Sequence, residues 1–191
     1  MRKLCSALEA CEEGNGRIVT ISGEPGIGKT RCTEELAELA SNRGFTVLRG
    51  HCQEQLVTPA YWPWVEALEG YIRPLVGEAL TDLLGKQAPI VSEFMPSIRL
   101  KIPDLDRPLT ATDSKAAEFR LLYTAFELVR DVSSNAPLMI VLEDLHWSDV
   151  QTLKLIEFFA PRIRSLRLLL IGAYRDVEVS RKHPLSSALG E

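Results

Sequence analysis

The segment Gly23-Glu-Pro-Gly-Ile-Gly-Lys-Thr30 decides the fold of this chain, because it matches the pattern G-x-x-x-x-G-K-[ST]. A β-rich run at 17–22 precedes it, and an amphipathic run at 29–42 follows it. In this context the glycines let backbone N–H groups converge on phosphate oxygens, and the helix adds its unpaired N-terminal donors and positive dipole end. The order strand, glycine-rich loop, helix therefore predicts a phosphate-binding loop.

This loop has the pattern of a P-loop, or Walker A motif, in nucleotide-binding proteins. Lys29 is expected to supply a point charge to the β- and γ-phosphates, and Thr30 a hydroxyl ligand to Mg²⁺. The alternative is a glycine-rich turn that carries an exposed lysine. The expected cofactors are ATP or ADP and Mg²⁺, and the predicted cofactor-binding residues are Gly23, Glu24, Pro25, Gly26, Ile27, Gly28, Lys29, Thr30 and Arg31.

A second motif lies at 138–144, where five apolar residues precede Glu143 and Asp144. A continuous apolar run is typical of a central parallel strand, and α/β sheets bind ligands at the carboxyl ends of such strands. We interpret the run as a Walker B motif in which Glu143 holds Mg²⁺, directly or through water, and Asp144 orients the attacking water as a catalytic residue. Two alternatives stay open: the acids exchange these roles, or both are solvated charges at a strand end.

Arg175 follows another apolar run, at 166–173. If this strand lies beside the Walker B strand, the arginine can sense the γ-phosphate and join Lys29, Glu143 and Asp144 in catalysis. The alternative is an ion pair with Asp176 or Glu178.

Two aromatic segments allow a functional and a structural interpretation. His146 and Trp147 follow Walker B, where packing and capping are favoured over catalysis. Tyr61, Trp62 and Trp64 are candidates for stacking on a base, and here too packing is favoured.

The fold class that these patterns predict is α/β, a doubly wound and mostly parallel sheet flanked by helices, as in P-loop NTPases. Strands are expected at 17–22, 45–49, 138–142 and 166–173, and helices at 29–42, from Asp113 or Ser114 to about 132, and from a capping box of Ser148 and Gln151 to about 160. The second of these helices carries an apolar stripe of Phe119, Leu122, Tyr123, Phe126 and Val129. The proline-rich stretch 61–109 is expected to form short helices and loops.

Composition narrows the function classes. With 191 residues, 46% of them hydrophobic, the chain suits one domain. A net charge of -4 argues against direct nucleic-acid contact by this segment. No apolar run approaches the roughly 20 residues of a membrane span, and no secretory leader is visible, so a cytoplasmic location without membrane contact is expected. The four cysteines form no C-x-x-C pair, so neither a zinc site nor a redox motif is indicated.

The motifs together resemble those of the STAND branch of AAA+-type ATPases, and most closely the nucleotide-binding domain of large LuxR-type transcriptional regulators and of adenylate-cyclase-like multidomain proteins. The segments that carry the resemblance are 23–30, Tyr61-Trp-Pro-Trp64, Leu142-Glu-Asp-Leu-His-Trp-Ser-Asp149 and Gly172-Ala-Tyr-Arg175. The resemblance implies that residues 1–191 are one ATPase core domain, without the N-terminal segment that contacts adenine and the C-terminal lid and winged-helix region. It also implies Arg175 as a sensor arginine, the chain's own further domains as partners, and ATP-dependent homo-oligomers.

The expected function is Mg-ATP binding and slow hydrolysis, which serves as a conformational switch in a larger signalling or transcription-regulating protein. One alternative is a scaffold module that holds nucleotide without hydrolysing it. A P-loop kinase is a third candidate, although the paired acids and the family-like motifs argue against it.

Overall fold

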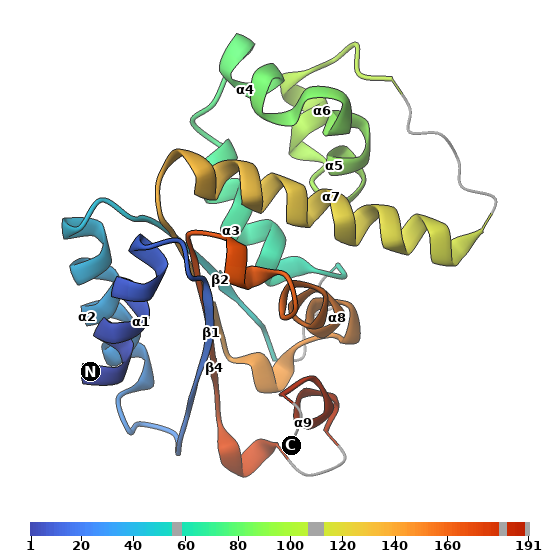
Figure 1. The fold of residues 1–191 in the computed structure, drawn as a ribbon. Coiled ribbons are helices and arrows are strands. Elements are labelled where there is room, and N and C mark those ends of the chain that lie inside the picture. Colours follow the sequence, from blue (N-terminus) through green and yellow to red (C-terminus); the bar gives the residue numbers. More distant parts are fainter. Residues whose placement is uncertain (55–58, 107–112, 180–182, 190–191) are drawn as a thin grey trace.

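A computed structural model of the chain describes residues 1–54, 59–106, 113–179 and 183–189. Its centre is one sheet of four parallel strands in the order β1-β4-β3-β2 (Figure 1). The strands are β1 (Arg17–Ser22), β2 (Thr46–His51), β3 (Leu138–Glu143) and β4 (Leu168–Tyr174). The parallel sheet with flanking helices confirms the predicted α/β P-loop NTPase fold class.

Helices cover both faces of this sheet. They are α1 (Arg2–Glu12), α2 (Lys29–Asn42), α3 (Trp62–Ile72), α4 (Gly77–Leu84), α5 (Ala88–Phe94), α6 (Ser97–Lys101), α7 (Ser114–Asn135), α8 (Val150–Phe159) and α9 (Pro184–Leu189), with short 3-10 turns η1 (Gly85–Gln87), η2 (Leu145–Trp147), η3 (Ile163–Ser165) and η4 (Asp176–Glu178). Helices α1 and α2 lie on one face and α3, α7 and α8 on the other, while α4, α5 and α6 form a further layer beyond α7 (Figure 1). In the part of the chain that the structure describes, no helix combines the length and apolar character needed to cross a membrane.

The alternation of side chains along β3 divides the core into two clusters. Met139 and Val141 pack with Leu8 and Leu36 from α1 and α2. The alternate side chains Leu138, Ile140 and Leu142 belong to the other cluster. They pack with Trp64 of α3, Val129 of α7 and Phe159 of α8. Every residue of β3 is buried, as predicted for a central strand with helices on both faces.

The predicted capping box at the start of α8 is wrong. Asp149 caps this helix, and its carboxylate accepts the N–H of Thr152 at 2.9 Å. The hydroxyl of Ser148 instead donates to the carbonyl of Leu145 at 2.7 Å. Aspartate competes well with serine as a cap, because its charge also favours the positive end of the helix dipole.

The apolar stripe predicted on α7 is buried in its second half only. Phe126 and Val129 lie in the core, whereas Phe119 and Tyr123 are 55% and 45% exposed. The first turns of α7 extend away from the sheet (Figure 1), where they contact α8 through Phe119 and Phe158, whose ring centres are 5.9 Å apart, and through the ion pair of Glu118 with Lys154. Helix α1 has no counterpart in the sequence-based prediction, because its apolar positions Leu4, Leu8 and Cys11 are too few to stand out.

The register of the sheet aligns the chemistry-bearing segments. Ser22 of β1 pairs with Tyr174 of β4, and Leu142 of β3 pairs with Gly172 of β4. All four strands are parallel, so the P-loop, the Walker B acids and Arg175 leave the sheet at the same edge. Strand β4 lies between β1 and β3, which puts Arg175 beside the Walker B strand as the sensor interpretation requires.

Candidate functional site

The P-loop joins β1 to α2 with backbone angles that need glycine. Gly26 and Gly28 have φ angles of 78° and 101°, in the left-handed region that side chains with a Cβ rarely enter. The side chain of Lys29 folds back over the loop, and its Nζ donates to the carbonyl oxygens of Gly23 at 2.8 Å and Glu24 at 3.0 Å. The loop is therefore shaped around its own lysine, at the N-terminal end of a 14-residue helix.

A cavity of about 280 Å³ opens at this end of the sheet and is called here the P-loop cavity. It is lined by Pro25, Gly26, Gly28, Lys29, Thr30, Asp144 and Arg175. The lining residues come from three separate segments: the loop after β1, the end of β3 and the end of β4. The cavity thus combines two cations, one carboxylate, one hydroxyl and loop backbone, which suits a polyphosphate with a bound cation.

Four predicted cofactor-binding residues do not line the P-loop cavity. Gly23 and Glu24 contribute the carbonyls that hold Lys29. Ile27 points into solvent. Arg31 also points outward, where its side chain is 83% exposed and pairs with Glu35 at 3.0 Å.

Asp144 reaches the P-loop cavity through an unusual backbone conformation. Its φ and ψ angles are 56° and 41°, and aspartate is one of the few residues other than glycine that tolerate this left-handed region. The chain turns here from β3 into η2, and the N–H of Trp147 closes the turn on the carbonyl of Asp144 at 2.9 Å. Backbone strain of this kind is frequent at functional sites.

Glu143, the neighbouring acid, does not line the cavity. Its side chain is 9% exposed. Its carboxylate lies 3.0 Å from the hydroxyl of Thr33, 3.4 Å from Nη1 of Arg49 and 3.1 Å from Nε2 of His51. The same Thr33 hydroxyl is 2.8 Å from the carbonyl of Thr30, so Glu143 joins β3 to the first turn of α2 and the end of β2. We call Glu143, Thr33, Arg49 and His51 the Glu143 cluster.

Arg175 lines the cavity and also makes the ion pair that sequence analysis offered as the alternative. Its Nη1 donates to Glu178 at 2.9 Å, and its guanidinium lies 5.0 Å from the ring centre of Trp147. This hydrogen bond lowers the pKa of Glu178 below its ordinary value. The backbone N–H of Arg175 donates to Nδ1 of His146 at 3.3 Å. The sensor and ion-pair interpretations are therefore compatible in this structure.

Oxygen donors for Mg²⁺ are present in the P-loop cavity. Thr30 and Asp144 offer a hydroxyl and a carboxylate, which are the hard ligands this ion prefers. Within the described ranges, no group of three or more His, Cys, Asp or Glu side chains could hold a metal ion. Such a set is not required here, because Mg²⁺ commonly binds through one or two protein groups together with phosphate and water.

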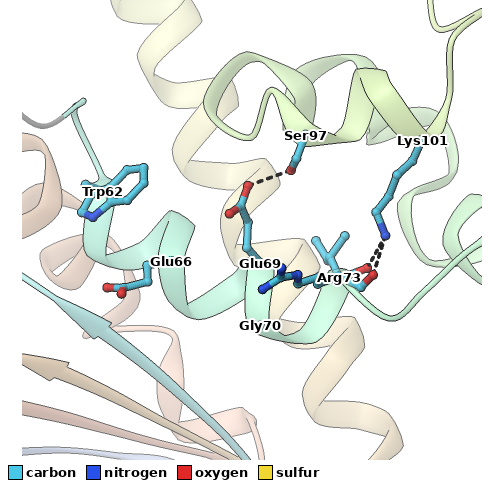
Figure 2. A pocket seen from close by; sticks show the side chains of 8 residues that line it. Trp62, Glu66, Glu69, Gly70, Arg73, Ser97 and Lys101 are labelled. Atoms are coloured by element: carbon cyan, nitrogen blue, oxygen red, sulfur yellow. Dashed lines mark hydrogen bonds between the residues drawn. The ribbon is translucent and has the colours of Figure 1, made fainter.

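A second, larger cavity of about 480 Å³ lies along α3 and is called here the α3 cavity. Figure 2 shows Trp62, Glu66, Glu69 and Arg73 along one side of α3, opposite Ser97 and Lys101. Glu69 accepts the hydroxyl proton of Ser97 at 2.7 Å, and Lys101 donates to carbonyl oxygens at the end of α3.

The aromatic cluster 61–64 lies away from the P-loop cavity. Trp62 lines the α3 cavity, and Trp64 is fully buried and stacked on Phe159 at 5.1 Å. Glu66 links the α3 cavity to the Glu143 cluster, because its carboxylate accepts the backbone N–H of His51 at 2.6 Å and lies 3.4 Å from His51 Nδ1. Sequence reasoning missed this link, since His51 and Glu66 carry no motif.

Comparison with known proteins gives a similar solved structure and a matching family. Among solved structures, a chain of "Structure of Drosophila ORC bound to DNA" is similar, with 12% sequence identity, a TM-score of 0.44, and coverage of 99% of this chain and 85% of that chain. The family model of the AAA ATPase domain matches residues 1–171. This match spans most of the sequence, and the chain belongs to the AAA ATPase domain family.

Proposed function

We propose that this AAA ATPase domain binds Mg-ATP in the P-loop cavity, hydrolyses it slowly, and serves as a nucleotide-dependent switch in a larger regulatory protein. The observation that carries the proposal is the convergence of Lys29, Thr30, Asp144 and Arg175 on one cavity from three separate segments. Family membership supports nucleotide binding and hydrolysis, and domains of this family typically use Mg²⁺.

Each cavity residue has a role that follows from its chemistry. Lys29 exchanges the carbonyls of Gly23 and Glu24 for phosphate oxygens, which are stronger acceptors because they are charged. Thr30 and Asp144 would hold Mg²⁺, which when bound neutralises charge on the phosphates. Asp144 also orients the attacking water, and Arg175 stabilises charge on the γ-phosphate.

In our proposal Glu143 does not meet the ligand, and it supports the residues that do. Its contacts with Thr33, Arg49 and His51 occupy the carboxylate on the side of β2, and Asp144 is the acid that reaches the cavity. We therefore assign both the metal role and the water role to Asp144, whereas the sequence analysis divided these roles between the two acids. Through Thr33, Glu143 holds the turn that presents the Thr30 hydroxyl.

The proposed switch role is supported by the resemblance of the motifs to those of LuxR-type regulators, and by the contacts that Lys29 and Arg175 make within the chain. Lys29 and Arg175 are both engaged by groups of this chain, so a nucleotide has to compete with them. Such competition lowers the affinity for nucleotide. Because Arg175 is expected to meet the γ-phosphate, ATP would displace its contact with Glu178 and ADP would not, which favours a difference between the two states. Domains beyond this core, and ATP-dependent association of copies of the chain, are part of the proposal.

A scaffold module that holds nucleotide without hydrolysing it is the second candidate. The observation in its favour is the engagement of Glu143 away from the cavity, which leaves one carboxylate, Asp144, to serve both metal and water.

Titration of the purified chain with ATP and with ADP, each with Mg²⁺, tests the proposal when phosphate release is followed in the same samples. Binding with slow release above the uncatalysed rate supports the switch. Binding without release supports the scaffold, and absence of binding to either nucleotide contradicts both.

A further inference from the structure

His146 is a buried histidine with one ring nitrogen in use. Its side chain is 0% exposed, and Nδ1 accepts the backbone N–H of Arg175 at 3.3 Å. A ring nitrogen that accepts carries no proton, so the neutral ring has its proton on Nε2. Within the part of the chain that the structure describes, this Nε2 has no hydrogen-bond partner.

The unpartnered donor lies between two carboxylates. Nε2 is 3.9 Å from Oδ1 of Asp144 and 3.6 Å from Oε2 of Glu178, both just beyond hydrogen-bond distance. Buried donors are rarely left without an acceptor, and each such group calls for an explanation. A small rotation of the Asp144 side chain would supply the missing acceptor.

The two carboxylates differ in what else they bind. Glu178 is exposed, so water can satisfy its carboxylate, and it also interacts with the side chains of Arg175 and Trp147, whereas Asp144 faces the P-loop cavity. His146 also belongs to the same turn as Asp144, two residues further along the chain. Its ring packs against Trp147 with the ring centres 4.5 Å apart, so this turn fixes the position of His146 relative to Asp144. The geometry favours Asp144 as the acceptor once a ligand orders the cavity.

We propose that His146 is a positioning residue for Asp144: its Nε2–H donates to the Asp144 carboxylate when a γ-phosphate in the P-loop cavity engages Arg175. The proposal rests on the proposed function and deepens it. It links the sensor arginine, through its backbone bond to His146, with the carboxylate that orients water. The ATP state then has a fixed Asp144, and the ADP state does not.

The first experiment observes the proton itself. The chain has three histidines, His51, His146 and His183, so ¹⁵N-histidine NMR gives few signals, and a His146→Asn spectrum assigns the relevant one. With Mg²⁺ and the β,γ-imido analogue of ATP, the Nε2 proton of His146 is expected to move downfield, and with ADP it is expected to stay. Asp144→Gly tolerates the left-handed backbone, removes the acceptor and is expected to abolish the shift. Glu178→Gln is expected to leave it.

The second experiment separates positioning from packing. His146→Asn retains an oxygen near the Nδ1 position for the Arg175 N–H but has no donor at the Nε2 position, whereas His146→Gln places an amide N–H there. We expect kcat to fall about tenfold in His146→Asn with the Kd for ATP within about threefold, and to recover in part in His146→Gln. His183→Asn, which removes a ring whose nitrogens lie 3.1 Å from the carbonyl of His146 and 3.1 Å from the N–H of Leu185, is the matched control.

The outcomes distinguish this proposal from the proposed function. A chain that binds no ATP contradicts both. A chain that binds and hydrolyses ATP while the His146 proton is unchanged, or follows Glu178→Gln instead of Asp144→Gly, overturns the positioning role alone. Equal losses of kcat and melting temperature in His146→Asn and His146→Gln would reduce His146 to a packing residue.

Discussion

The P-loop cavity and the Glu143 cluster lie on opposite sides of the end of β3, and they show how adjacent acids acquire different tasks. In the cavity, Lys29 and Arg175 are held by groups that a phosphate can replace, and Asp144 faces open space. In the Glu143 cluster the carboxylate is buried and already has three partners. A side chain that is to meet a ligand stays incompletely paired, whereas one that supports it is saturated by its own protein.

Replacement of Lys29 should produce the largest effect, because it removes the cation of the cavity loop. Hydrogen bonds to charged groups contribute roughly 1.5–3 kcal/mol each, so Lys29→Ala is expected to weaken ATP binding about 100-fold in calorimetric titration. Lys115→Ala, at an exposed position at the start of α7, is the control. Equal affinities of the two variants would show that phosphate does not bind at the loop.

Asp144→Asn should separate binding from turnover. The variant keeps the shape and the left-handed backbone, and it loses the charge that orients water. We expect phosphate release to fall about 100-fold and the Mg²⁺ dependence of binding to decrease, because Asp144 is also a proposed Mg²⁺ ligand, while the affinity for ATP without Mg²⁺ and the melting temperature stay nearly unchanged. Undiminished release by Asp144→Asn would return the catalytic role to Glu143 or favour the scaffold function.

Glu143→Gln should lower the stability of the fold, whereas Asp144→Asn is expected to lower turnover. It removes a buried negative charge and leaves Arg49 and His51 facing a neutral amide in place of the carboxylate they share. Loss of one member of a buried ion pair costs several kcal/mol, but these two side chains are 29% and 45% exposed and can turn to water, so a loss of about 1–3 kcal/mol in the free energy of unfolding is expected. Denaturant unfolding measures it. If Glu143→Gln unfolds like the native chain but loses Mg²⁺ dependence, Glu143 is a metal ligand and the comparison made above fails.

Mild acid should lower the free energy of unfolding through His146, which lies beside the P-loop cavity residues Asp144 and Arg175. Burial lowers the pKa of His146 in the folded state, so between that pKa and about 6.5 the unfolded chain binds the proton and the folded chain does not. The stability contributed by the neutral ring is therefore present above pH about 6.5 and is lost as the pH falls through this window. Unfolding curves measured at several pH values give the free energy of unfolding as a function of pH. Between the two pKa values this free energy should change less with pH in His146→Asn than in the native chain. An identical slope would mean that His146 does not titrate in this range.

The smallest effect is expected from Glu66→Gln, which weakens the contact between α3 and His51. Glu66 is partly exposed, so we expect a loss of about 0.5–1 kcal/mol in the free energy of unfolding. Glu69→Gln is a matched control, since Glu69 lies on the same helix and lines the same cavity but bonds to Ser97 (Figure 2). A decrease in stability that is additive with Glu143→Gln would show that Glu66 and Glu143 are not coupled through His51.

Local pattern was a good guide wherever local physics decides the outcome. The strand 17–22 and the helix 29–42 agree with the predicted ranges, because the β-rich run ends at the glycine-rich turn, and the amphipathic run begins after that turn and ends before Gly44. The buried strand β3 was equally clear from its apolar run. The exposed start of α7 and the existence of α1 were not predictable in this way, since each depends on which neighbours cover a helix. The cap of α8 is local, but Ser148 and Asp149 are both good capping residues, so the pattern alone did not choose between them.

The sequence by itself determined the P-loop, the parallel α/β class and the identity of Lys29, Thr30, Asp144, Glu143 and Arg175 as candidates. Fixed spacing within one strand, loop and helix carries that information, because backbone geometry dictates it over a few residues. Only the tertiary structure decided that Asp144 faces the cavity while Glu143 joins Arg49 and His51, and that the backbone of Arg175 meets His146. These contacts bring together residues far apart in the chain, and the strand order β1-β4-β3-β2 that creates them has no local signature.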